Sequence, residues 1–265
     1  MAAPVWALAQ QPAKAPAKTP AKIAAPAGLG PAPAKLRPIL SDLASSDVGK
    51  VRHAIGELQQ DGSPYAARTL EAFVRRGPPG PALVPAIRAL GSLHRPESIG
   101  VILDLTRHRR ADARVAAAEG LSNYREARSA SALGRLLSDP DADVRGAAAS
   151  SLSTAGTRAT VGLLFRALER HIDEAATGIG RLGNAEEVSR LAGMLGRLPL
   201  ETLLPGLEAA ILRADLSAAA RVDVVRKLGA LQTPEVKEFL ERVQLAVPTA
   251  AVREAMAAEA ARIAG

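Results

Sequence analysis

A leucine recurs with a period of roughly 30 residues through the middle of this 265-residue chain. Each of these leucines closes a short apolar segment with helical spacing, and a second such segment follows; the positions are Leu58, Leu90, Leu121, Leu152 and Leu182. A period of this length is typical of a solenoid, in which one helical hairpin cannot bury its own apolar face and therefore stacks on its neighbours. The repeat predicts an all-α fold, and no segment shows the alternation of a strand.

Other positions of the repeat keep the same period. The residue four before each leucine is small, which favours close approach of two helices, and the set is Ala54, Ala86, Ala117, Ala148 and Gly178. The residues nine and twelve after each leucine are apolar in every unit, as Val161 and Leu164 are after Leu152. Offsets of nine, twelve and sixteen lie on one face of a helix, so each unit is predicted to contain a second helix with a buried face.

One repeat unit resembles a known family. Asp139 to Leu152 reads Asp-Pro-Asp-Ala-Asp-Val-Arg-Gly-Ala-Ala-Ala-Ser-Ser-Leu. This is similar to the first helix of a bacterial HEAT repeat, in the short variant called phycobilisome-lyase-like, and residues 108–121 repeat it more loosely. The resemblance covers about residues 36–245 and implies a right-handed α-α superhelix. Such repeats serve scaffolds, lyases, inhibitors and adaptors alike, so the resemblance implies a fold and not one function.

We predict three segments along the chain. They are a disordered Pro/Ala/Lys-rich tail (1–35), a half-repeat cap with five HEAT-like hairpins (36–198), and a region with a degenerate repeat, a final hairpin and a capping helix (199–265). The stretch from Met1 to Pro38 holds eight of the nineteen prolines and no acidic residue. Such a segment cannot bury enough apolar surface to fold, so we interpret the tail as a tether or spacer.

The tail also explains the net charge of +7. Five basic residues of the tail have no acidic residue near them, namely Lys14, Lys18, Lys22, Lys35 and Arg37. Residues 39–265 therefore carry 29 basic and 27 acidic groups and are nearly neutral. A nearly neutral body does not favour specific binding of nucleic acid, whereas the tail is suited to contact with acidic envelope or polyanion surfaces.

The first nine residues leave two alternatives for localisation. Ala7-Leu8-Ala9 before Gln10 resembles the end of a secretory signal, although a basic n-region is missing and the apolar stretch is short. We favour a periplasmic or exported protein whose true start codon lies upstream, so that residues 1–9 are a signal-peptide remnant. A cytoplasmic protein is the alternative. No apolar run approaches the roughly 20 residues that span a bilayer.

The residue spacings that enzymes of this kind require are missing. No histidine forms the His-Glu dipeptide of helical-repeat di-iron hydroxylases, no two histidines stand at i and i+4, and the chain has no cysteine. We therefore expect no catalytic residue, metal or cofactor. Two alternatives stay open. One is a lyase-like enzyme or enzyme subunit, suggested by the family resemblance, and the other is a nucleic-acid-binding helical-repeat protein.

The sequence favours a scaffold or adaptor that performs no chemistry and binds an unidentified protein or peptide. We expect second helices to line the concave face, with offsets ten, fourteen and seventeen pointing away from the core. These offsets carry Arg68, Arg75, Asp104, Arg107, Arg135 and Arg166. Asp104, Arg135 and Arg166 are separated by one repeat period each and are predicted to form a row along the groove. Arginine suits bidentate recognition of carboxylates, and a merely solvated row is the alternative.

A second set of charges stands at the starts of the first helices. It contains Asp112 with Arg114, and Asp141 or Asp143 with Arg145. We interpret these residues as helix caps and charge pairs within the chain, because carboxylates are favourable at a helix N-terminus.

Overall fold

Each repeat unit forms a hairpin of two helices in the computed structural model, which describes residues 30–263. These residues contain no β-strand. Their α-helices are α1 (Arg37–Leu43), α2 (Val48–Asp61), α3 (Pro64–Arg75), α4 (Gly80–Ser92), α5 (Ile99–Leu105), α6 (Ala111–Leu121), α7 (Ala127–Leu136), α8 (Ala142–Ala155), α9 (Val161–Leu168), α10 (Ala175–Leu182), α11 (Ala185–Ala192), α12 (Leu200–Leu212), α13 (Ala218–Gly229), α14 (Pro234–Gln244) and α15 (Ala250–Arg262). The predicted signal remnant and the tail up to residue 29 lie outside the described residues.

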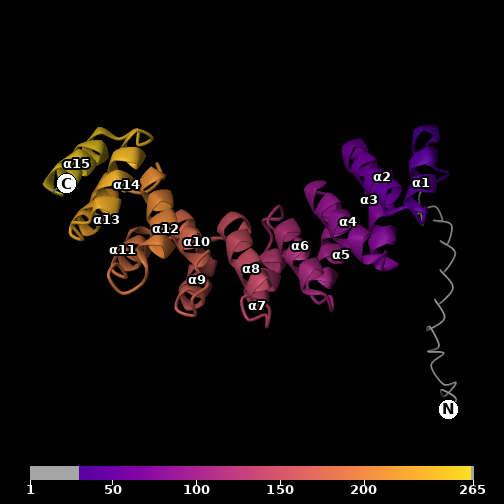
Figure 1. Cartoon of the computed structure of the whole chain (residues 1–265), viewed down its shortest axis with the longest axis horizontal. Helices are drawn as coiled ribbons and strands as arrows, with labels where there is room; N and C mark the ends of the chain where they lie inside the picture. The colour runs from indigo at the N-terminus through magenta and orange to yellow at the C-terminus, as the bar shows by residue number, and fades with distance from the viewer. Residues whose placement is uncertain (1–29, 264–265) are drawn as a thin grey trace, which may run out of the picture.

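The hairpins stack side by side into a long, shallow arc, with α1 at one end and α15 at the other (Figure 1). We call α2, α4, α6, α8 and α10 the first helices, because they carry the recurring leucines in their last turn or close to it. We call α3, α5, α7, α9 and α11 the second helices. The predicted all-α solenoid is thus confirmed.

Local sequence signals define the helix ends. The Asp141 side chain accepts hydrogen bonds from the backbone N–H groups of Asp143 (3.0 Å) and Val144 (3.2 Å) at the start of α8. Asn184 and Glu187 form a reciprocal capping box at the start of α11. These bonds satisfy backbone donors that the first turn of a helix leaves without partners.

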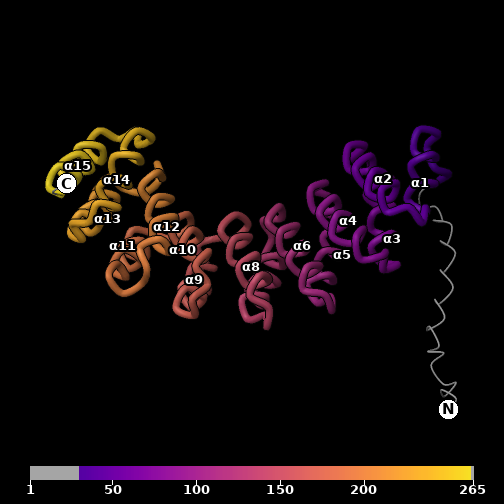
Figure 2. Tube along the Cα trace, viewed as in Figure 1, coloured from indigo at the N-terminus to yellow at the C-terminus, as the bar shows by residue number. Residues whose placement is uncertain are grey.

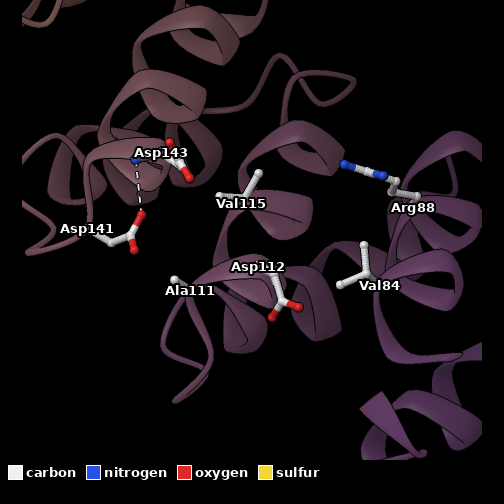
Figure 3. A pocket seen from close by; sticks show the side chains of 7 residues that line it. All are labelled: Val84, Arg88, Ala111, Asp112, Val115, Asp141 and Asp143. Atoms are coloured by element: carbon white, nitrogen blue, oxygen red, sulfur yellow. Dashed lines mark hydrogen bonds between the residues drawn. The ribbon is translucent and has the colours of Figure 1, made fainter. Parts of the chain in front are cut away.

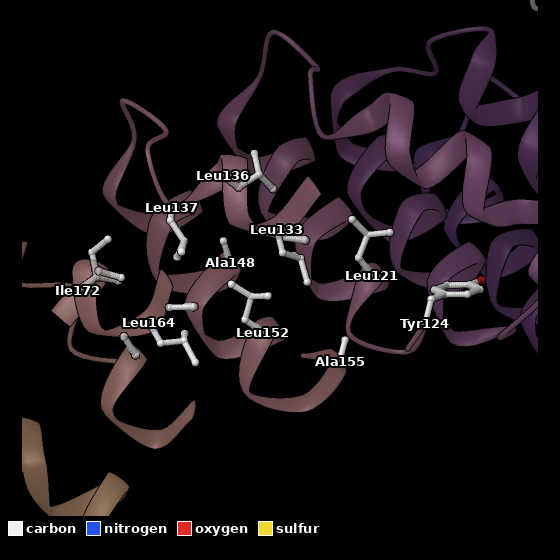
Figure 4. Close-up of a cluster of buried hydrophobic side chains, with 14 of the residues drawn as sticks. Leu121, Tyr124, Leu133, Leu136, Leu137, Ala148, Leu152, Ala155, Leu164 and Ile172 are labelled. Carbon is white, nitrogen blue, oxygen red and sulfur yellow. The ribbon is translucent and has the colours of Figure 1, made fainter. Parts of the chain in front are cut away.

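The recurring leucines form the centre of the core. Leu58, Leu90, Leu121 and Leu152 have no exposed surface, whereas Leu182 is half-buried. Figure 4 shows how the units join, with Leu121 and Leu152 of two first helices lying close to Leu133 and Leu164 of two second helices. The core runs without interruption from one hairpin to the next, as stacked repeats require.

The first helices pack on one another more closely than the second helices do. The main helix contacts run from α4 to α6, from α6 to α8 and from α10 to α12, whereas successive second helices make at most marginal contacts. Small residues permit this approach: a Cβ atom on Gly91 of α4 would lie only 2.7 Å from the Cα atom of Gly120 in α6. A row of paired helices bends toward the side on which the spacing is shorter.

The arc therefore curves around the first helices. Figures 1 and 2 show α4, α6, α8, α10 and α12 on the inner, concave side, and α7, α9 and α11 on the outer side. Second helices were predicted on the concave face, and that prediction is wrong. The physical reason is the small residues of the first helices, such as Gly91 and Gly120, which allow those helices to lie closer together than the second helices.

The regular alternation ends after α11. The helix α12 packs closely on α10, and α13, α14 and α15 then pack mainly on one another. The helix α12 continues the row of helices on the concave side. The next helix in the sequence, α13, does not form a regular hairpin with it.

Candidate functional site

All six residues predicted to bind a partner lie on or directly after second helices. Arg68 and Arg75 are on α3, Asp104 is on α5 with Arg107 two residues after its end, Arg135 is on α7 and Arg166 is on α9. All six are exposed, as the sequence analysis expected. They do not line the concave face, because the second helices form the outer layer of the arc.

Two of the six residues have a partner within the chain. Glu71 is 2% exposed, and both Arg68 and Arg75 place a guanidinium nitrogen 3.7 Å from its carboxylate. The Ser98 hydroxyl also donates a hydrogen bond of 2.7 Å to Glu71. A buried carboxylate needs such compensation, so Arg68 and Arg75 help to stabilise the fold where α3 meets the start of α5.

The other four residues do not form a connected group. Asp104, Arg135 and Arg166 occupy equivalent positions on α5, α7 and α9, and no salt bridge or hydrogen bond joins them within residues 30–263. Arg135 donates a hydrogen bond of 3.0 Å to Ser131 on its own helix. That this row reads an acidic partner stays a prediction.

The concave side carries a depression of about 470 Å³ across α4, α6 and the start of α8. Val115 lies near its middle, and Val84 and Arg88 of α4 stand together at one side (Figure 3). Three carboxylates complete the lining, from Asp112, Asp141 and Asp143. The first helices thus present an apolar floor with an acidic margin.

A second depression of about 280 Å³ lies between α10 and α12. Its carboxylates come from Asp173, Glu174 and Glu201, and Thr177 and Pro205 line it as well. We call the six carboxylate residues of the two depressions the concave acidic face, namely Asp112, Asp141, Asp143, Asp173, Glu174 and Glu201. Of the residues that line the depressions, only Arg88 is basic.

Most of these carboxylates have no ion-pair partner. Arg88 is already paired with Glu119 of the next first helix, with Nε 2.8 Å from the carboxylate, and these bonds raise the pKa of its guanidinium. Arg110 donates a hydrogen bond of 2.9 Å to Asp112 and so lowers the pKa of that carboxyl. Within residues 30–263, the other five residues of the concave acidic face form no salt bridge. Their negative charge is therefore available to a cationic ligand.

The charges at the helix starts only partly follow the predicted pairing. Arg114 pairs with Asp139 and not with Asp112, at 2.7 and 2.8 Å. Arg145 donates to the backbone carbonyls of Asp139 and Pro140. Asp141 does cap α8, whereas Asp143 is left free at the surface.

The sequence contained a signal for the concave acidic face. Asp112, Asp143 and Asp173 recur along the chain with the period of the leucines. A charge that recurs with the repeat falls on one line along a stack, just as the recurring core residues do. The interpretation of Asp112 and Asp143 as caps or charge pairs leaves Asp173 out, so it does not recognise this row of carboxylates.

Two further features of residues 30–263 bear on function. They contain no group of three His, Cys, Asp or Glu side chains that could hold a metal ion. None of their helices is long and apolar enough to cross a bilayer.

A family model and one solved structure support the helical-repeat fold. A family model described as HEAT repeats matches residues 67–153. The complex of CpcE and CpcF of phycocyanin lyase from Nostoc sp. PCC7120 is similar over 84% of this chain and 98% of the matched chain, with 19% identity and a TM-score of 0.50. Human deoxyhypusine hydroxylase matches 85% of this chain and 94% of its own, with 18% identity and a TM-score of 0.42. The search of curated proteins gave no match. The chain is a helical solenoid, and residues 67–153 match HEAT repeats.

Proposed function

We propose that this chain is a scaffold or adaptor that performs no chemistry and binds a protein or peptide partner on the concave acidic face. The observation that carries the proposal is the pair of depressions on the concave side, which hold five carboxylates with no ion-pair partner in the described residues and of which the first also has an apolar floor. Such a surface suits a segment with both apolar and basic side chains. A cation that replaces part of the hydration of an unpaired carboxylate stabilises its negative charge. Opposite charges on the two binding surfaces also increase the rate of association.

The similar structure from Nostoc is itself a complex of two chains, which supports a partner for a solenoid of this kind. The alternative function is that of an enzyme or enzyme subunit, because the similar structure is that of a lyase. The second-helix row of Asp104, Arg135 and Arg166 is the alternative surface, and it would select an acidic partner.

Selection of a random peptide library on the full-length chain tests the proposal. We expect enriched peptides to carry lysine or arginine together with apolar residues. A triple variant, Asp143→Asn with Asp173→Asn and Glu201→Gln, should weaken their binding by about tenfold or more, since each hydrogen bond to a charged group contributes roughly 1.5–3 kcal/mol.

A matched variant removes three carboxylates elsewhere, through Glu97→Gln, Asp104→Asn and Glu238→Gln. These residues are exposed and form no salt bridge in the described part of the chain. It should bind the selected peptides as wild type does. Enrichment of acidic peptides, or equal losses in both variants, would refute the proposed face.

A further inference from the structure

We infer that the chain's own lysine segment, Lys14 to Lys22, binds to the concave acidic face in the same molecule. The inference rests on the proposed function, because it names an occupant for the same face. Three observations carry it, namely the charges on both sides, their spacings and the length of chain that joins them.

The charges are complementary. Five carboxylates of the concave acidic face form no salt bridge within residues 30–263. The largest group of basic residues with no acid near them in the sequence is the segment that holds Lys14, Lys18 and Lys22, in three copies of Pro-Ala-Lys. One exposed ion pair contributes little, but several pairs formed by one tethered segment add together.

The spacings also correspond. Asp112 and Asp143 lie in the first turns of α6 and α8, Asp173 lies two residues before the start of α10, and packed helices lie about 8–10 Å apart. The three lysines recur at every fourth position. In the extended polyproline conformation that Pro-Ala sequences favour, four residues span about 12 Å. A segment of this type therefore offers a lysine for each successive helix of the concave side.

The connecting chain is long enough. Gly30, the first described residue, lies at the α1 end of the arc. Extended chain at about 3.1 Å per residue places Lys22 up to about 25 Å and Lys14 up to about 50 Å from Gly30. Counted from α1, the helices α6, α8 and α10 are three, four and five steps along the row, which amounts to about 24–30, 32–40 and 40–50 Å. The extended segment is therefore long enough for Lys14 to reach α10.

Cysteine cross-linking in the full-length chain tests the inference, since the native chain has no cysteine. The test pair is Thr19→Cys with Thr177→Cys, because Thr177 is half-buried between the carboxylates of the second depression. The control pair is Thr19→Cys with Gly100→Cys, on the outer helix α5 where no atom lies within 4 Å of an added Cβ. Under mild oxidation we expect a monomeric product that forms about tenfold faster in the test pair, owing to the higher effective concentration.

Charge variants show whether the carboxylates cause the difference. Asp143→Asn, Asp173→Asn and Glu201→Gln together should slow the test pair to the rate of the control pair, and 1 M salt should do the same by screening. The matched set of Glu97→Gln, Asp104→Asn and Glu238→Gln should leave the rate unchanged. Equal rates in the test and control pairs would overturn the inference, and a covalent dimer would overturn its assignment to one molecule.

A labelled peptide of residues 10–24 separates this inference from the proposed function. The peptide is added to a full-length variant with Lys14→Gln, Lys18→Gln and Lys22→Gln, in which the internal competitor is removed. We expect it to bind this variant at least about fivefold more tightly than wild type, as release from an intramolecular competitor requires. Carboxylate-dependent binding that is equal in both proteins would leave the face intact and overturn the internal occupant. No binding to either protein would contradict the face as well.

Discussion

Substitution of Gly91 by alanine tests the origin of the curvature. The added Cβ atom would stand 2.7 Å from the Cα atom of Gly120, whereas carbon atoms in favourable contact are about 3.5–4.0 Å apart. The backbone of α4 fixes the position of this Cβ atom and the Gly120 Cα atom belongs to the backbone of α6, so no side chain can rotate away, and α4 must move from α6 by about 1 Å. Overpacking of this kind costs about 1–3 kcal/mol, and the better helix propensity of alanine returns at most about 1 kcal/mol.

The expected net loss is about 1–2 kcal/mol, which lowers the Tm by about 2–8 °C for a domain of this size. Gly100→Ala is the matched control, because this glycine also lies in a helix but has open space around it. It should gain about 0.5–1 kcal/mol from helix propensity alone. Thermal unfolding followed by circular dichroism measures both variants. If Gly91→Ala is as stable as Gly100→Ala, the first helices are not in close contact there, and the explanation of the curvature is incorrect.

Three other predictions concern the fold and the tail. Leu121→Ala and Leu152→Ala should each lower the free energy of unfolding by about 2–5 kcal/mol, because neither side chain has exposed surface. A denaturant titration measures this loss, and midpoints equal to that of wild type would contradict the predicted register. Burial opposes the ionisation of Asp139, but the hydrogen bonds from Arg114 and from the backbone N–H of Asp141, together with the charges of Arg114 and Arg145, outweigh it and hold the pKa of this carboxyl below its usual value. Asp139→Asn should therefore cost about 1–3 kcal/mol at neutral pH. The difference in Tm from wild type should shrink as the pH falls below about 4, where Asp139 of the unfolded chain takes up a proton, and should vanish only below the lower pKa of the folded state; a difference that is independent of pH would exclude this linkage. Replacing Lys14, Lys18 and Lys22 by glutamine should remove most retention on heparin at low salt, and unchanged retention would place the basic surface on the solenoid.

The sequence was sufficient to predict the hairpins, because the burial of Leu58, Leu90, Leu121 and Leu152 repeats with the period and leaves a readable pattern. It was not sufficient to predict which helices face inward. That choice depends on the difference between two helix spacings, which is decided by contacts between units such as Gly91 with Gly120. The positions of the apolar residues within one repeat unit do not reveal whether the first or the second helices of neighbouring units lie closer together.

The candidate site was missed for a related reason. Arg135 and Arg166 were recognised because they repeat on an exposed helix face, and they are indeed exposed. Asp143 and Asp173 repeat equally well, but a carboxylate near a helix start has a ready local explanation as a cap. Asp141 does cap its helix and Asp143 does not. Only the hydrogen bonds of the folded chain distinguish the two residues.

The central claim is that the concave acidic face, and not the second-helix row, binds the partner segment. One titration series tests it most directly, with a library-selected peptide and three full-length proteins: wild type, the triple amide variant at Asp143, Asp173 and Glu201, and Arg135→Ala with Arg166→Ala. We predict a loss of about tenfold or more in affinity for the amide variant and wild-type affinity for the arginine variant. Wild-type affinity in the amide variant together with a comparable loss in the arginine variant would contradict the account and place the binding surface on the outer side of the arc.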